Sequence, residues 1–570
     1  MRRYFEAEMR MLRDAGEAYA EAHPEQARQL GLDNIHDRDP YVERLLEGFA
    51  FLSAQVRQRI DAAAATTAND LLEASAPDLV RPYPAATVVA FAPTRRQRGS
   101  RHVPAGTALR SEPMGQERVR LEMRTTRQLT VTPLELVSLD AGETPWDTTR
   151  FRLEFRWHGE EAWNTALAEG VPVFLDADRP LALALYRLFG NGLSNAAMEL
   201  PDGSRQLLPE LRFSPDGFDR DQAVNAALPT ARPGLRLLQD YFAFRARYLF
   251  LRLQGLAEPD EAGTAPQRFY LTFETQRGLP RDHRLSARNL ALHAVPAVNL
   301  FPCEARPVHV DGREQESEIR AEADRVGTVR VHSVRSAHAR GRKSARLREL
   351  RSLESMVGPD QSGAWYATEC RDVTGDWPTV WLRTGGLPLD EAHTVSLALN
   401  ATHGNLPRRY LREERLEASG RELPAGLVAR SLFRPSPSRQ PADPIRRANV
   451  LLALLRADLE SLLDRDALVS CLNAVEWTAA PENRSRIKAL ESVTARPFQR
   501  MEAGVLVSGI EVQLELREES GFSSLDDVYL FGEVLHQFFR DRAPMNQALV
   551  TRLVCQPSGR SFQWPRGTLC

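Results

Sequence analysis

Residues 39–60 read DPYVERLLEGFAFLSAQVRQRI, and apolar side chains recur along them at steps of three and four residues. The stripe consists of Val42, Leu45, Phe49, Leu52, Val56 and Ile60, a spacing close to that of a coiled coil. Asp39 supplies a carboxylate N-cap and Pro40 takes the first helical position, so the pattern predicts a helix that begins here. We predict that the stripe, and Leu45, Phe49, Leu52 and Val56 in particular, is buried in a bundle shared with a partner; the alternative is a local bundle.

The flanking segments are also typical of helices. Another apolar stripe lies before residues 39–60 and is formed by Phe5, Met9, Leu12, Ala15, Tyr19 and Ala22. His23–Pro24 should end that helix, because proline cannot donate to the helical hydrogen-bond ladder and disfavours helix in the residue before it. A third, shorter helix is expected over residues 69–75, before the prolines at 77, 82 and 84. We therefore predict an N-terminal helical region over residues 1–84.

After Pro84 the apolar period changes from 3.6 to 2, which is typical of strands with one buried face. Alternating patterns cover residues 119–123, 151–157 and 269–273, and short helices are expected over residues 180–189 and 235–242. These short runs predict a β-rich middle region over residues 85–330, antiparallel or mixed, with short helices.

A second middle region is expected over residues 331–445. It contains a basic run formed by Arg335, Arg340, Arg342, Lys343, Arg346, Arg348 and Arg351. The run predicts a flexible basic loop, solvated or folded on an acidic partner; a nucleic-acid arm is less favoured because no aromatic residue is interleaved to stack bases. The Pro/Ser-rich residues 434–444 are interpreted as a linker.

The last segment, residues 446–570, is predicted to be a separate C-terminal α+β unit with helices over 450–463 and 529–539 and a strand over 506–516. The whole chain is therefore expected to be a multidomain α+β protein. Its 570 residues exceed the roughly 250–300 at which one core stops growing, so about three to five folding units are expected.

Composition excludes several classes of protein. The formal charge is −2, from 74 basic and 76 acidic residues, which argues against a nucleic-acid-coating chain. The five cysteines form no CxxC pair and their number is odd, so a reducing cytoplasm is expected. The longest aliphatic run, residues 450–455, is far shorter than a membrane span, and the N-terminus lacks a signal core. We predict a soluble, cytoplasmic protein without direct membrane insertion.

A search for chemistry finds no GxSxG, HExxH or Gly-Lys-Ser phosphate loop. Asp176-Ala177-Asp178 is interpreted as helix capping in preference to a divalent-ion site, and His36 near Asp33 and Asp37 as loop capping. We predict no catalytic, cofactor or metal site, and an assembly or binding protein. Two alternatives stay open: an enzyme whose site is built from residues distant in sequence, and a nucleic-acid-associated factor using the 335–351 run.

Residues 5–24 and 39–60 resemble the N-terminus of the TssF family, baseplate subunits of the bacterial type VI secretion system. Further motifs resemble the family in chain order: Arg81-Pro82-Tyr83-Pro84, LLQDYFAF (237–244), VPAVNLF (295–301), Asn405-Leu406-Pro407, Ser508–Val512, the helix through 534–539, and Trp564-Pro565-Arg566. The chain departs from the family in the run 335–351, the segment 435–444, the stretch around Met545-Asn546-Gln547, and a short tail ending at Cys570.

The resemblance implies a scaffold with no enzymatic activity, cofactor or small-molecule substrate. Family members pair with TssG, two TssF copies holding one TssG, and the resulting wedges join TssK and TssE. The wedges encircle a VgrG spike and dock the contractile sheath and inner tube, in a cytoplasmic baseplate at the inner-membrane complex. The expected mechanism is mechanical: a change in subunit arrangement releases sheath contraction.

Overall fold

The computed structural model describes residues 2–29, 40–93, 98–146, 148–160, 163–224, 232–256, 267–279, 284–310, 316–322, 327–341, 344–349, 363–371, 377–388, 392–413, 415–418, 424, 427–440, 444–502, 504–544 and 546–565. The chain divides into two compact units. One comprises Met1–Leu72 with Asp443–Leu452, and the other Glu73–Ala442 with Ala453–Cys570. Strands and helices are mixed, which confirms the α+β class; the four-region division stays a prediction.

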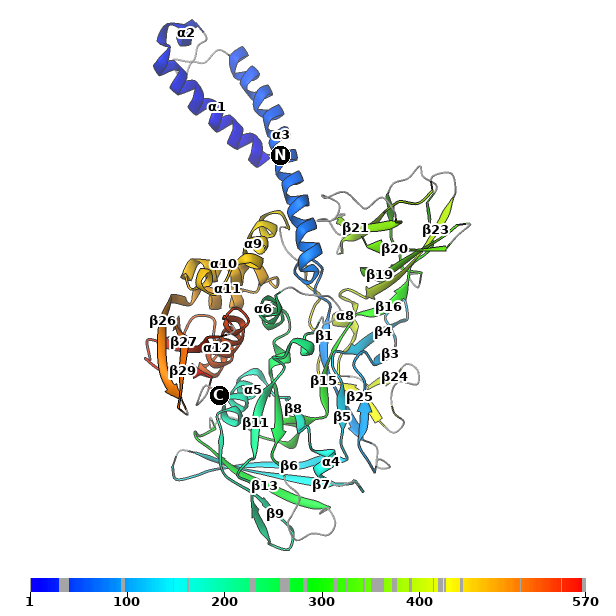
Figure 1. The fold of residues 1–570 in the computed structure, drawn as a ribbon, viewed down its shortest axis with the longest axis vertical. Coiled ribbons are helices and arrows are strands. Elements are labelled where there is room, and N and C mark those ends of the chain that lie inside the picture. The colour runs from blue at the N-terminus through cyan, green and yellow to red at the C-terminus, as the bar shows by residue number, and fades with distance from the viewer. Residues whose placement is uncertain are drawn as a thin grey trace. The chain divides into compact units, whose positions relative to one another are not determined.

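Helices α1 (Arg2–Ala22), α2 (Pro24–Gln29) and α3 (Pro40–Ser75) build the first unit (Figure 1). α1 ends before Pro24, as predicted, and it runs antiparallel to α3. The prediction of two helices over residues 39–75 is wrong, because α3 is continuous. Residues 61–68 (DAAAATTA) contain no proline or glycine and are rich in alanine, the best helix former, so nothing interrupts the helix. Asp39, the predicted N-cap, lies outside the described residues.

Six antiparallel strands close a barrel in the second unit. In barrel order they are β1 (Ala86–Pro93), β15 (Ala294–Val298), β4 (Val119–Thr125), β3 (Ala108–Met114), β24 (Arg415–Ala418) and β25 (Leu427–Ser431). The buried side chains inside include Phe91, Leu121 and Met123. The barrel therefore draws strands from both of the predicted middle regions, because β1 pairs with β15 on one side and with β25 on the other.

Two further antiparallel sheets lie in the predicted β-rich region. One has the order β10 (Arg205–Leu207), β9 (Leu193–Glu199), β13 (Arg268–Thr275), β7 (Thr149–Trp157), β6 (Leu134–Glu143). The other has the order β11 (Arg212–Asp216), β12 (Phe250–Gln254), β8 (Val171–Leu175), β14 (Leu290–Leu292), and β2 (Arg101–Val103) pairs with β5 (Leu129–Val131). β4, β7 and β13 confirm the three period-2 patterns. The two expected helices are α5 (Arg179–Gly190) and α6 (Pro233–Ala243); α4 (Trp163–Ala166) and short 3₁₀ helices, including η3 (Arg245–Tyr248), complete the region.

The predicted flexible basic loop is wrong over its described part, which forms a β-hairpin in an eight-stranded sheet. The sheet contains β16 (Phe301–Glu304), β17 (Val308–Val310), β18 (Glu316–Glu318), β19 (Arg330–Arg340), β20 (Ser344–Glu349), β21 (Trp365–Arg371), β22 (Thr379–Gly385) and β23 (His393–Thr402). Ala337, Ala339 and Leu347 are buried and interleave with basic residues, so one face packs while the charges stay on the other. Arg342, Lys343 and Arg351 lie outside the described residues.

The Pro/Ser segment predicted as a linker is instead anchored over residues 436–439. Ser438 Oγ donates to Tyr83 O at 2.8 Å, and Ser436 Oγ accepts from Ala86 N at 3.1 Å. Residues 83 and 439 exchange backbone hydrogen bonds in an isolated bridge. Nearby, α8 (Leu406–Tyr410) begins with the Asn405-Leu406-Pro407 motif, and Asn405 Oδ1 accepts from Ser438 N at 2.8 Å. The segment is therefore part of the folded body.

The C-terminal elements are α9 (Pro444–Arg456), η5 (Glu460–Leu462), α10 (Arg465–Val475), α11 (Pro481–Lys488), β26 (Leu490–Glu502), β27 (Val505–Arg517), α12 (Leu525–Arg540), β28 (Ala548–Gln556) and β29 (Ser561–Trp564). The four strands form one sheet, and α12 crosses from β27 to the parallel strand β28 (Figure 1). A β-carbon at Gly532 of α12 would collide with the Trp564 ring, so glycine lets the helix approach the sheet closely.

The single predicted helix over 450–463 is divided into α9 and η5. Within the described part of the chain, no helix is both long and apolar enough to span a bilayer.

Candidate functional site

The residues predicted to form a partner interface lie on one face of α3, and their side chains are exposed. The exposed fractions are 73% for Leu45, 60% for Phe49, 61% for Leu52 and 57% for Val56, and Ile60 continues the stripe at 62%. The side chain of Val42 lies outside the described residues. The alternative prediction was that these side chains are buried in a bundle within the chain. The described part of the chain does not bury them.

A different face of α3 packs against α1. Ala50 and Ala54 are fully buried, and Glu8 on α1 is buried beside them. The Glu8 carboxylate accepts hydrogen bonds from Arg57 Nη1 at 2.7 Å and Ser53 Oγ at 2.8 Å, and these bonds lower its pKa. Small alanines let the two helices approach closely, so the hairpin is held by alanines, the buried Met9 of α1 and polar contacts, while the large apolar side chains of the α3 stripe stay exposed.

This exposed surface is unusual for a monomer. We name it the α3 stripe, formed by Leu45, Phe49, Leu52, Val56 and Ile60. Single exposed apolar residues need no explanation, but contiguous patches mark sites of protein or membrane interaction. Gln55 and Arg59 are exposed beside the stripe on the same helix, and polar neighbours of this kind are expected at the rim of an apolar interface core.

The motifs that carry the family resemblance meet inside the second unit although they are far apart in sequence. Tyr83, in Arg81-Pro82-Tyr83-Pro84, donates its hydroxyl to Asp240 Oδ1 at 2.8 Å, and Asp240 lies in LLQDYFAF on α6. The Asp240 carboxylate also pairs with the buried Arg247 guanidinium. Arg236 of α6 pairs with Asp78 at 3.0 Å. These residues therefore connect the end of the helical region to α6.

Asn299, in VPAVNLF, joins two other segments. Its Nδ2 donates to Glu122 O at 2.6 Å, and its Oδ1 accepts from Thr402 Oγ1 at 2.8 Å and from His403 N at 2.7 Å. Asn299 is fully buried, so loss of any of these partners would leave a polar group unsatisfied in the interior. The motif residue is structural.

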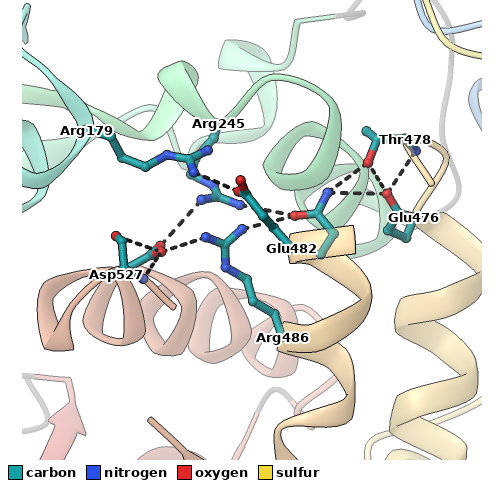
Figure 2. Close-up of polar contacts among 9 residues, drawn as sticks. Arg179, Arg245, Glu476, Thr478, Glu482, Arg486 and Asp527 are labelled. Carbon is teal, nitrogen blue, oxygen red and sulfur yellow. Dashed lines mark hydrogen bonds and ion pairs between the residues drawn. The ribbon is translucent and has the colours of Figure 1, made fainter. Parts of the chain in front are cut away.

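A buried ionic cluster joins η3, α11 and α12 (Figure 2). The Asp527 carboxylate at the start of α12 accepts from Arg486 Nη2 at 2.6 Å and from Arg245 Nη1 at 3.4 Å. Ser523 adds backbone and hydroxyl hydrogen bonds to the same carboxylate at 3.2 and 3.3 Å. Asp527 and Arg486 are almost completely buried. Burial lowers the pKa of Arg245, and the nearby Tyr241 and Asp527 oppose that shift.

The cluster continues towards the end of α10. Asn483 Oδ1 accepts from both Arg486 at 3.1 Å and Arg245 at 3.3 Å, while its Nδ2 donates to Thr478 Oγ1 at 2.9 Å (Figure 2). Glu476 binds the loop that follows α10, accepting from Thr478 N at 2.9 Å and Ala479 N at 3.1 Å. This cluster was not predicted from the sequence, because its members lie far apart along the chain and no regular spacing marks them.

The residues weighed as metal ligands do not form a metal site in the described structure. No group of three or more His, Cys, Asp or Glu side chains suited to a metal ion occurs among the described residues. Asp178 takes the N-cap position of α5, where its carbonyl accepts from Ala182 N at 2.9 Å, but its side chain makes no cap hydrogen bond. Burial raises the pKa of Asp176 to about 6. Asp33, His36 and Asp37 lie outside the described residues.

A buried carboxyl on α12 predicts a pH dependence. Tyr186 donates its hydroxyl to Glu533 Oε2 at 2.8 Å, and burial raises the pKa of Glu533 to about 7 from its ordinary value of 4.5. Between these two values the folded state holds a proton that the unfolded state releases, so the free energy of unfolding falls by up to about 3 kcal/mol as pH rises through this window. Glu533→Gln keeps an acceptor for Tyr186 but removes the titration. We expect the variant to unfold at higher urea than the parent at pH 8, with the difference vanishing near pH 4.5.

Another buried group on α12 titrates in an overlapping pH range, because burial lowers the pKa of His536 to about 4. Its titration makes the free energy of unfolding rise with pH, opposite to the effect of Glu533. His536 is present in both proteins, so its contribution cancels in their difference. Parallel stability curves from pH 4.5 to 8 would contradict the assignment to Glu533.

Comparison with known proteins agrees with this arrangement. The family model described as "Type VI secretion system, TssF" matches residues 1–568. The chain is similar to the type VI secretion system component TssF1 of Pseudomonas aeruginosa, at 28% identity over 359 residues. That alignment covers 59% of this chain and 57% of the relative, little more than half of each.

Two solved structures share the fold. The chain is similar to one in a cryo-electron microscopy structure of the TssK-TssF-TssG baseplate subcomplex, with a TM-score of 0.79, 29% identity, and coverage of 92% of this chain and 98% of that one. A chain of the baseplate complex from the type VI secretion system gives a TM-score of 0.62, 25% identity, and coverage of 99% and 98%.

The fold and these likenesses define the class of protein: a structural component of the type VI secretion baseplate. Within this class, the chain belongs to the TssF family, whose model spans nearly its whole length.

Proposed function

We propose that this chain is a wedge subunit that assembles with a TssG-like and a TssK-like partner. The proposal is supported by the likeness, over 92% of this chain, to a chain in the TssK-TssF-TssG subcomplex. Its role is structural and not enzymatic: it holds partners in a fixed arrangement. No cofactor, small-molecule substrate, nucleic acid or direct membrane insertion forms part of the proposed function.

The α3 stripe is the single observation that carries the proposal. Obligate interfaces are more apolar than transient ones, and they resemble a protein core cut in two. Five large apolar side chains in helical register on α3 form such a surface, and the described residues of the chain leave it uncovered. A partner helix packed on the stripe would bury these side chains in the manner of a coiled coil.

The family resemblance supports finer assignments, which belong to the same proposal. Two copies of the chain hold one TssG-like subunit, and the wedges join a TssE-like subunit around a VgrG spike. The wedges dock the sheath and inner tube, in the cytoplasm at the inner-membrane complex. Large interfaces hold the loaded ring, and a change in subunit arrangement releases contraction.

The buried polar contacts suit such a mechanical role. Asp527, Asp240 and Asn299 each bind side chains or backbone from other segments of the second unit. Fully satisfied buried networks specify and rigidify one packing arrangement. A stiff body of this kind can transmit a displacement from one interface to another.

The experiment that tests the proposal is co-expression with the TssG homologue of the same genome, followed by native mass measurement. We expect a complex containing two copies of this chain and one TssG-like subunit, with the chain poorly behaved when expressed alone because the α3 stripe is uncovered. A monodisperse, stable monomer that ignores the co-expressed partner would sink the proposal. A complex of other stoichiometry would refute the two-to-one assignment while leaving the partnership intact.

A further inference from the structure

A polar cavity of about 950 Å³ opens in the second unit. Its walls come from the turn between β6 and β7, the end of β13, the C-terminal half of α5 and the start of β29. Arg187, Arg277 and Arg560 all line it. Three segments far apart in sequence therefore bring guanidinium groups to one surface.

Arg187 is the anchored member of this group. Its guanidinium pairs with Asp526 in the first turn of α12 and lies 5.7 Å from the centre of the Phe562 ring. Its side chain is only 10% exposed. Burial is the main cause that lowers its pKa, and the charges of Arg277 and Arg560 lower it further, as expected for cations held close together.

Arg277 and Arg560 are exposed and, among the described residues, neither forms a salt bridge. Among the described residues at the cavity, the acidic groups are Asp526, which is paired with Arg187, and Glu143 in the lining. The described side chains of the site therefore carry one positive charge in excess. This balance suits a carboxylate, which carries one negative charge and accepts two parallel hydrogen bonds from arginine. A polyphosphate would bring several negative charges against the two carboxylates already present.

We propose that this cavity binds an acidic segment of a partner protein, with a carboxylate of that segment held between Arg277 and Arg560. The choice of a protein ligand rests on the proposed baseplate function. The proposal gives this chain a second interface, which is polar and distinct from the apolar α3 stripe. Hydroxyl groups of Thr144, Thr148 and Ser561 line the same cavity and can donate to neighbouring peptide groups of the segment.

The test is fluorescence anisotropy of a fluorescein-labelled hexaglutamate peptide added to the full-length chain at low salt. We expect saturable binding that weakens as salt is raised, and a loss of at least about fivefold in affinity for the Arg277→Gln/Arg560→Gln variant. The matched control is Arg120→Gln/Arg288→Gln, which removes the same charge from exposed sites outside the cavity; it should bind as the parent does. Hexaglutamine should not bind.

Three results would overturn the inference: no binding at about 1 mM peptide, equal losses in the two double variants, or displacement of the peptide by inorganic triphosphate at concentrations below those of free hexaglutamate. The last result would assign the cavity to phosphate groups. The peptide assay needs no baseplate partner, and the Arg277→Gln/Arg560→Gln variant leaves the α3 stripe intact. Failure of the peptide assay and failure of the TssG-like co-expression can therefore be distinguished.

Discussion

Leu45→Asp is expected to leave the isolated subunit folded and to abolish its complex with a TssG-like partner. Leu45 is 73% exposed on α3, so an aspartate there meets water in the lone subunit and should change its stability by no more than about 0.5 kcal/mol. In a bundle the same aspartate would be buried as an unpaired charge at the centre of an apolar contact. We expect the affinity for the partner to fall at least about 100-fold. Melting of the lone subunit and a quantitative pull-down of the co-expressed partner measure the two effects.

Gln58→Asp is the matched control for this experiment. Gln58 is exposed on α3 but lies off the α3 stripe, so its replacement introduces the same residue into the same helix without entering the proposed contact. The control should retain both folding and partner binding. A subunit that unfolds with Leu45→Asp, or a complex that survives it undiminished, would refute the shared bundle.

Asp527→Ala is expected to destabilise the second unit by about 3–5 kcal/mol. The substitution removes the carboxylate that Arg486 and Arg245 share, and it leaves two guanidinium groups buried without their counter-charge. Because a multidomain chain need not unfold in one step, the loss is best measured by hydrogen exchange in α11 and α12 together with a thermal melt. Both segments should lose protection.

The control for the second experiment is Asp466→Ala, since the Asp466 side chain is 82% exposed and pairs with an exposed arginine. An exposed pair of this kind contributes at most about 1 kcal/mol, so this variant should melt near the parent. A double variant, Arg486→Met with Asp527→Leu, should recover part of the loss by replacing charges with apolar side chains. Unchanged protection of α12 in Asp527→Ala would contradict the role assigned to the cluster.

Local patterns in the sequence predicted several of the helices and a few of the strands. Steps of three and four residues predicted α1 and the start of α3, and alternation predicted β4, β7 and β13. The α3 stripe was also identified as an interface before its exposure was known, and that assignment stays a prediction. The periodicity of a helix or strand is set by neighbouring side chains, and it is therefore visible in a short window.

The hairpin of β19 and β20 shows where local patterns mislead. Its arginines dominated the composition and suggested a solvated loop, although the interleaved Ala337, Ala339 and Leu347 already alternate with them. Small alanines give a weak apolar signal, so the charged face outweighed the buried one. In α3 two helices were expected where the structure has one: residues 61–68 contain no large apolar residue, and alanine favours the helix without marking a face.

The sequence by itself determined the helical and strand periods, the apolar character of the α3 stripe, and the order of the family motifs. Only the tertiary structure decided which segments meet. β1 pairs with β25 in the barrel, Tyr83 donates to Asp240, and Tyr186 donates to Glu533 across 347 positions of the chain. Such partners share no spacing that a window can detect, because the chain folds back through intervening elements before they come within hydrogen-bond distance. Burial then gives these contacts their strength, since a polar group removed from water must find its partner within the protein.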